Sequence, residues 1–161
     1  MTSGPKPCKT CGGETKITTL GLFRGEHGPV AILVSGMPAV VCAQGHKRFL
    51  HSGSADQLTD LVADAEKFAP QPPAVRRGWF SKRYHCNGCD AELPAVPTKK
   101  SERVLDASLK GAAPFKVVVE VALYKCEGCG REQVLTNDEV AGSAAKAMEH
   151  GFRGADIQAA R

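Results

Sequence analysis

The sequence has few aromatic residues and no long apolar run. Aromatic side chains make up 6% of the 161 residues, with a single tryptophan, so half of this chain has few large side chains to bury. Units of that size usually need a metal ion or disulfide bonds for stability. The longest apolar runs, 30–34 and 117–119, have the length of strands and are far shorter than a membrane span. We therefore expect a small globular protein with no membrane partner.

Motifs of common enzyme classes are also missing from the sequence. The chain has no G-x-S-x-G, no phosphate-binding glycine loop and no cysteine–histidine pair outside its metal-type clusters. No carboxylate stands beside the cysteines as it does in H-E-x-x-H sites. We therefore predict that the protein is not an enzyme, and no small-molecule substrate is evident. A hydrolase with an open, water-bearing metal site is the alternative that these absences disfavour.

The first seven residues do not resemble a signal peptide, because they are polar, contain proline and glycine, and include no apolar stretch. We therefore expect a cytoplasmic protein. In that reducing compartment, paired cysteines are metal ligands more often than disulfides. The chain also has seven cysteines, an odd number that intramolecular disulfides cannot use completely.

All seven cysteines belong to short clusters, and the second half of the chain has two C-x-x-C pairs. Cys86 and Cys89 form one pair, and Cys126 and Cys129 form the other. Two such pairs, brought together by strands, supply four thiolates for a tetrahedral zinc ion. We predict a four-cysteine zinc site from them, with iron as the alternative metal.

The first half has three cysteines that can form a second zinc site: Cys8, Cys11 and Cys42. The fourth ligand must therefore be another residue type. His46 is our candidate, because Gly45 keeps a turn and the longer imidazole compensates for a shift of one residue. His51 is the rival, His27 in an expected hairpin loop is a weaker one, and a three-cysteine site with water stays open. The chain is thus expected to bind two zinc ions.

The two halves share an order of elements: a cysteine turn, strands, a second cysteine turn and a helix. Residues typical of strands occupy 15–23, 30–34, 39–42 and 115–124. We predict a small, metal-stabilised α+β fold of two tandem zinc ribbons, each followed by an α-helix. The expected units are a first ribbon with its helix (1–70), a proline-rich and basic-aromatic linker (71–85), and a second ribbon with its helix (86–161).

Both expected helices have sequence signals at their ends. The first begins near Ser54, which can form a capping box with Gln57, and stops before Pro70. The second is capped by Thr136 or Asn137 and ends at Gly151. The last ten residues are expected to be frayed or weakly helical.

Basic and aromatic residues alternate in only one segment, 75–85. Its candidate nucleic-acid-binding residues are Arg76, Arg77, Trp79, Lys82, Arg83 and Tyr84. Aromatic rings that stack on bases, next to cations that pair with phosphates, form such surfaces. The interpretation that we favour is a linker whose Trp79 and Phe80 pack onto a ribbon, because two thiolate-bound zinc ions lower the formal charge of the chain from +4 to about +1.

One stretch resembles a known family. Cys8-x-x-Cys11-Gly-Gly, followed by Val34-Ser-Gly-Met-Pro38-Ala-Val-Val-Cys42, resembles the YgiT/MqsA-type zinc-finger domain over about residues 8–50. The resemblance implies that Cys8, Cys11 and Cys42 bind zinc. In antitoxin members this domain contacts the toxin, and a separate helix-turn-helix domain binds DNA. This chain departs from the family at Gly45-His46, where the family has Cys-Gly, and a second half that resembles a generic zinc ribbon replaces the helix-turn-helix.

These features predict a non-enzymatic zinc-binding protein that acts as an adaptor or regulatory module for a protein partner. The alternative is a nucleic-acid- or ribosome-associated regulator that uses residues 75–85. The sequence identifies neither the partner nor the oligomeric state.

Overall fold

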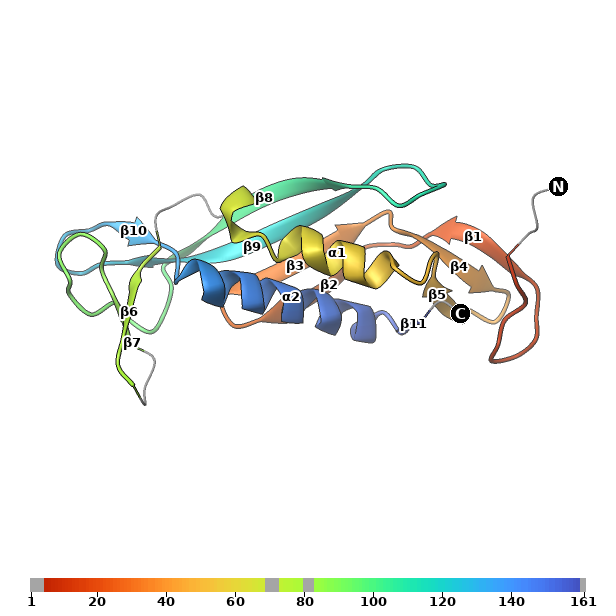
Figure 1. Ribbon diagram of the computed structural model, residues 1–161, viewed down its shortest axis with the longest axis horizontal. Coiled ribbons are helices and arrows are strands. Elements are labelled where there is room, and N and C mark those ends of the chain that lie inside the picture. The colour runs from red at the N-terminus through yellow and green to blue at the C-terminus, as the bar shows by residue number, and fades with distance from the viewer. Residues whose placement is uncertain (1–4, 69–72, 80–82, 160–161) are drawn as a thin grey trace.

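A computed structural model describes residues 5–68, 73–79 and 83–159 and shows an elongated α+β molecule (Figure 1). The strands are β1 (Thr15–Thr19), β2 (Phe23–His27), β3 (Val30–Ser35), β4 (Pro38–Cys42), β5 (Lys47–Phe49), β6 (Val75–Arg77), β7 (Arg83–His85), β8 (Lys99–Ala107), β9 (Phe115–Lys125), β10 (Glu132–Gln133) and β11 (Ile157–Gln158). The helices are α1 (Ser54–Val62), the short 3-10 helix η1 (Ala65–Lys67) and α2 (Asn137–Gly154).

Strand β9 is the central strand of the main sheet. It pairs antiparallel with both β8 and β3, and β2 continues the sheet beyond β3. Val117, Val119 and Val121 of β9 are all buried, because alternate residues of a strand face the same side. Helix α2 packs against β2 and β3, and α1 packs beside α2. The helices thus cover one face of the sheet and enclose the core (Figure 1).

The two halves of the chain share this main sheet. Six residue pairs join β3 of the first half to β9 of the second, from Val30–Val121 to Ser35–Lys116, and one hydrophobic cluster contains side chains of both halves. The α+β class is confirmed, but separate sheets for two tandem ribbons are not. Valine-rich strands bury more apolar surface by pairing with each other than either half can bury alone. The division into units at residues 70 and 86 stays a prediction. Strand β3, before this division, pairs with β9, after it.

A smaller sheet lies at one end of the molecule, in the order β1-β4-β5-β11. The chain passes from β3 into β4 through Gly36, whose φ of 78° allows the bend. Because β3 and β9 are antiparallel, β3 leads toward this small sheet and β9 leads away from it. The other end carries β10 and the β6–β7 pair (Figure 1).

Helix α1 is confirmed from Ser54, but the predicted capping box is wrong. The Ser54 hydroxyl accepts a hydrogen bond from the His51 amide at 3.0 Å, and no side chain caps the helix. The Gln57 side chain instead donates to the Ser108 carbonyl at 3.0 Å. The helix ends at Val62, and η1 follows it, so the segment that we expected to form one helix is divided between two.

Helix α2 begins as predicted but ends later. The Thr136 hydroxyl caps it by accepting from the Glu139 amide at 3.3 Å. The predicted end at Gly151 is wrong, since the helix continues to Gly154. Of the last ten residues, which we expected to be frayed or weakly helical, 152–154 belong to α2, Ile157–Gln158 form β11, and 160–161 lie outside the described residues. Within the described residues, neither α1 nor α2 is long and apolar enough to span a membrane.

Gly151 stays inside the helix because β2 crosses α2 there, at Gly25. A Cβ atom on Gly25 would overlap the Ala147 carbonyl oxygen and the Gly151 amide. We expect Gly25→Ala to lower the free energy of unfolding by about 3 kcal/mol, because the backbones of β2 and α2 must move apart to make room for the methyl group. Gly142→Ala is the control. Gly142 is an exposed residue of α2, and a Cβ atom there would contact no other atom, so this change should raise the free energy of unfolding by about 1 kcal/mol. Urea denaturation measures both changes, and similar values for the two variants would contradict the close crossing.

Candidate metal centres

Three of the four ligand-bearing turns have the same backbone pattern. In the turns that begin at Cys8, Cys86 and Cys126, the cysteine amide donates to the carbonyl five residues later, and the amide four residues later donates back to the cysteine carbonyl. The residues that donate back have positive φ values of 71°, 64° and 77°: Gly12, Asp90 and Gly130. Such a turn directs both sulfurs of a C-x-x-C pair to one side, where they can share a metal ion.

The turn from Cys42 to His46 is one residue shorter. The Cys42 amide donates to the His46 carbonyl at 3.1 Å, and the Gly45 amide donates back to the Cys42 carbonyl at 3.0 Å. Gly45, with φ of 87°, therefore has the role of Gly12, Asp90 and Gly130, although it stands three residues after Cys42, where the other turns have their second cysteine. The ligand comes from the next residue, His46, whose longer side chain reaches back to the cysteines.

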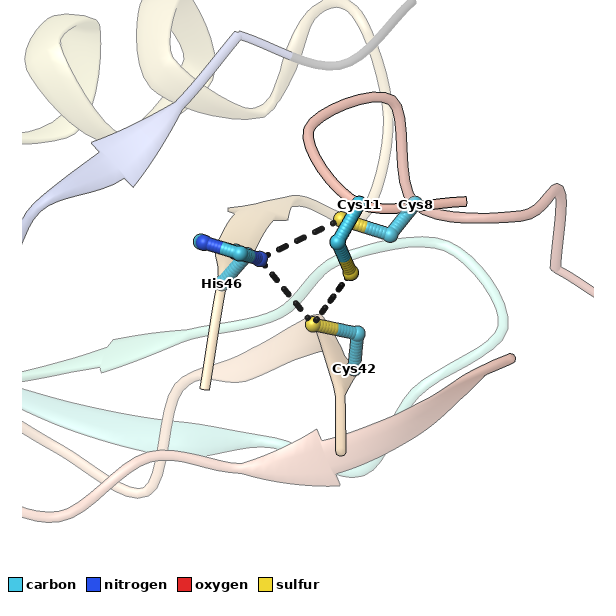
Figure 2. Close-up of side chains that lie close together, drawn as sticks. All are labelled: Cys8, Cys11, Cys42 and His46. Atoms are coloured by element: carbon cyan, nitrogen blue, oxygen red, sulfur yellow. Dashed lines mark hydrogen bonds between the residues drawn. The ribbon is translucent and has the colours of Figure 1, made fainter. Parts of the chain in front are cut away.

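The first cluster, site 1, consists of Cys8, Cys11, Cys42 and His46, with all ligand atoms within 4.8 Å of one another. His46 Nδ1 lies 3.6 Å from Cys8 Sγ and 3.3 Å from Cys42 Sγ, and Cys11 Sγ lies 3.7 Å from Cys42 Sγ. Figure 2 shows these side chains pointing toward one another. Zinc bonds of about 2.3 Å to sulfur and about 2.0 Å to nitrogen place tetrahedral ligands about 3.6–3.8 Å apart. The residues of site 1 therefore fit one zinc ion.

The two rival histidines lie outside site 1. His51 donates from Nε2 to the Lys110 carbonyl at 2.6 Å. The His27 ring packs edge-on against His150, with the ring centroids 5.4 Å apart. Of the three candidate histidines, the structure brings only His46 to the cysteines of the first half.

Site 1 is held together by segments from distant parts of the chain. Pairing of β1 with β4 places Thr15 opposite Cys42, which brings the Cys8–Cys11 turn to the end of β4. Arg48 of β5 donates to the Lys6 and Pro7 carbonyls at 2.8 and 3.3 Å. Strand β11 then pairs with β5 directly after the His46 turn. A metal ion at site 1 would thus fix one corner of the small sheet.

The second cluster, site 2, consists of Cys86, Cys89, Cys126 and Cys129, again with all sulfurs within 4.8 Å of one another. Cys86 Sγ lies 3.5 Å from Cys129 Sγ, and Cys89 Sγ lies 3.4 Å from Cys126 Sγ. These separations far exceed the disulfide bond length of about 2.05 Å, and all seven cysteines are free thiols. Site 2 therefore also fits a tetrahedral metal ion.

Gln133 supports site 2 from a fully buried position. Its Oε1 accepts from the Asn87 amide at 2.8 Å, inside the first turn of the site. The pKa of Cys86 is lowered to about 5, first by a hydrogen bond to the Gln133 side chain and then by backbone amides of the turn, so the metal-binding thiolate is favoured. The sequence analysis did not identify Gln133. The only indication of its role in the sequence is its place: Gln133 stands between charged and apolar residues directly after the last cysteine turn.

At site 1, the thiolate of Cys8 is favoured without such a buried side chain. The pKa of Cys8 is lowered to about 6, chiefly by the Cys11 amide. The pKa of His46 is raised, chiefly by its hydrogen bond to Cys42. Zinc binds the neutral imidazole, so a metal ion competes with the proton at His46.

We expect Gln133→Met, a change of similar volume, to weaken zinc binding at site 2 by about 10- to 100-fold. The Asn87 amide and the Cys86 thiolate would each lose a hydrogen-bond partner. Competition with a chromophoric chelator measures the affinity. Gln57→Met, at a glutamine on the exposed side of α1, is the control and should leave both zinc affinities unchanged. Equal affinities in the two variants would contradict the role of Gln133.

The basic-aromatic segment contributes to neither metal cluster. It forms the antiparallel β6–β7 pair, and Trp79 in the connection between these strands is 95% exposed. The favoured prediction, that Trp79 packs onto a ribbon, is therefore wrong. Phe80 and Lys82 lie outside the described residues.

The other candidate residues of this segment differ in their surroundings. Arg76 and Arg83 are exposed, and Arg77 pairs with Asp90 at 2.8 Å. Tyr84 is half-buried and packs against the core, so its ring is not a free stacking surface. Among the described residues of this segment, the exposed aromatic and cationic groups are thus Trp79, Arg76 and Arg83, and the charge of Arg77 is partly neutralised by Asp90.

The geometry shows two clusters that can hold a metal ion, one of three cysteines and a histidine and one of four cysteines. The resemblance of residues 8–50 to the YgiT/MqsA-type domain, and of the second half to a zinc ribbon, rests on the motifs alone and stays a prediction. No family model, no curated protein and no solved structure matches this chain.

Proposed function

We propose that the chain is a non-enzymatic protein that binds two structural zinc ions, one at each end of its central sheet. The observation that carries this proposal is that each cluster offers four thiolate or imidazole ligands at tetrahedral separations. Structural zinc sites use such sets of four cysteines, or of three cysteines and a histidine, whereas catalytic zinc keeps an open position beside three protein ligands. Zinc suits both sets, and iron is the alternative metal for the four thiolates of site 2.

The arrangement of the two sites supports a role as an adaptor or regulatory module for a protein partner. Site 1 adjoins the small sheet, site 2 follows β9, and the main sheet runs between them (Figure 1). Metal ions at the two ends would hold the surrounding loops in fixed shapes, so two separate surfaces can bind partners. We place this role in the cytoplasm, where free thiols stay reduced.

Metal analysis of the purified chain tests the zinc proposal. We expect two zinc ions per chain after expression in medium that contains both zinc and iron. A single zinc ion, or iron retained at site 2, would contradict it. The adaptor role is tested by crosslinking the full chain in cells and identifying the proteins joined to Lys9 near site 1 or Lys125 near site 2. Catalytic turnover by a chain that forms no such crosslinks would overturn that role.

A further inference from the structure

The β6–β7 pair forms a small ribbon that is attached to site 2. The two strands make a sheet of their own, with Val75 opposite His85 and Arg77 opposite Arg83. Cys86 follows β7 directly. Arg77 donates through Nε to Asp90 of the Cys86 turn at 3.0 Å. The base of the ribbon is therefore tied to the metal-binding turn.

Trp79 is the most exposed of the large apolar residues in the described chain, at 95%. It is also the only tryptophan in the sequence. An indole ring normally buries a large apolar area, yet this one lies in the connection of a narrow ribbon. Gly78, with φ of 100°, turns the backbone just before it. The ribbon thus presents a flat aromatic surface to solvent.

The cations of the ribbon are placed where they repel one another. Arg77 and Arg83 are directly opposite on neighbouring strands, and like charges at such positions destabilise a β-ribbon. Asp90 compensates Arg77, and exposed Arg76 adds a further cation on the other face of the ribbon. An anionic partner would relieve this repulsion, and its charge would match the ribbon.

From these features we propose that the ribbon binds single-stranded nucleic acid. An unpaired base stacks on Trp79, and the phosphates next to it pair with Arg76 and Arg83. A flat aromatic ring beside guanidinium groups is the chemistry that holds single strands without sequence preference. A duplex does not suit it, because stacked base pairs expose no free base face to an indole. The zinc-loaded chain has a formal charge of only about +1, so this attraction is local to the ribbon.

The single tryptophan makes the test direct, since all indole fluorescence of the zinc-loaded full chain comes from Trp79. Titration with an oligothymidylate of about 15 nucleotides should quench this emission and protect it from acrylamide. A labelled oligonucleotide, followed by anisotropy, then gives affinities for the variants. Trp79→Ala should weaken binding about tenfold, and Trp79→Phe should recover most of the loss because a ring remains.

The charge variants separate the ribbon from the rest of the surface. Arg76→Gln with Arg83→Gln should weaken binding and make the slope of log affinity against log salt less steep by about 1.4. Lys16→Gln with Arg103→Gln removes the same charge from exposed sites on β1 and β8 and should change neither affinity nor slope beyond a small uniform effect. Zinc content and melting temperature confirm that each variant is folded.

Three results would overturn the proposal. One is the absence of quenching at low salt. Another is an affinity for polyglutamate, or for a duplex of the same length, that equals the affinity for the single-stranded oligonucleotide. Such a result would indicate a protein partner or nonspecific charge attraction. The last is equal losses in the ribbon variant and the Lys16/Arg103 control.

Discussion

We expect Cys126→Ser to leave one zinc ion per chain and to lower the free energy of unfolding by about 5 kcal/mol or more. Cys126 directly follows β9, the central strand, and its side chain is 1% exposed within the main hydrophobic cluster. Without it, the binding free energy of the metal ion is lost, and Cys86 stays buried beside the core with no metal partner. A domain of this size is stable by only about 5–15 kcal/mol, so much of the variant should be unfolded. Metal analysis and urea denaturation measure the two effects.

Cys42→Ser is the matched comparison. Cys42 is also a buried cysteine at the end of a strand, but the main hydrophobic cluster contains Cys86 and Cys126 and no cysteine of site 1. We expect this variant to lose one zinc ion as well, with a clearly smaller loss of unfolding free energy. If both variants keep two zinc ions, neither cysteine is a ligand. If their stability losses are equal, the special coupling of site 2 to the core is wrong.

The grouping of ligands could be predicted because it depends on local sequence. A C-x-x-C pair forms its turn from neighbouring residues, and the three regular turns have the same hydrogen bonds, with a glycine or Asp90 directly after the second cysteine. His46 could be predicted as the fourth ligand because its imidazole is longer than a cysteine side chain. This length compensates for its place one residue after the position where the other turns have a cysteine. The metal identity is not fixed by the geometry and belongs to the proposal.

The joining of the two halves could not be predicted, because it depends on which strands pair. Apolar strands such as 30–35 and 115–125 carry the same signal whether they pair within one half or between halves. The free energy of the whole core favours the pairing of β3 with β9. The position of Gly151 is a related case. A glycine near a helix end indicates a stop, but here it allows Gly25 of β2 to approach the helix.

Tertiary partners also explain the other differences. Ser54 and Gln57 have the spacing of a capping box, but His51 and Ser108 compete for their hydrogen bonds. Trp79 was expected to pack, since apolar rings usually do. No surface of the described chain covers it, and such exposure becomes visible only in three dimensions.

His46→Ala should likewise leave one zinc ion per chain, but with a local effect. Site 1 fixes a corner of the β1-β4-β5-β11 sheet, so its loss should release the segments that converge there. We expect amide exchange to accelerate by about 100-fold or more in β1 and β11 and to stay slow in β9 and α2. His51→Ala is the control and should keep two zinc ions, because His51 hydrogen-bonds to Lys110 outside the site. Two zinc ions in His46→Ala would contradict its assignment as a ligand.

The double variant Gly45→Cys/His46→Gly tests why the turn uses histidine at all. It restores the Cys-Gly order of the other turns, but their pattern closes five residues after the first cysteine, at Lys47 instead of His46. Lys47 now pairs with Val41, so β5 would slip by one residue and turn each of its side chains to the opposite face. Phe49 would then leave its contact with Phe152, where the ring centroids are 4.8 Å apart. We expect two zinc ions but a free energy of unfolding lower by about 3 kcal/mol; unchanged stability would mean that the short histidine turn does not set the register of β5.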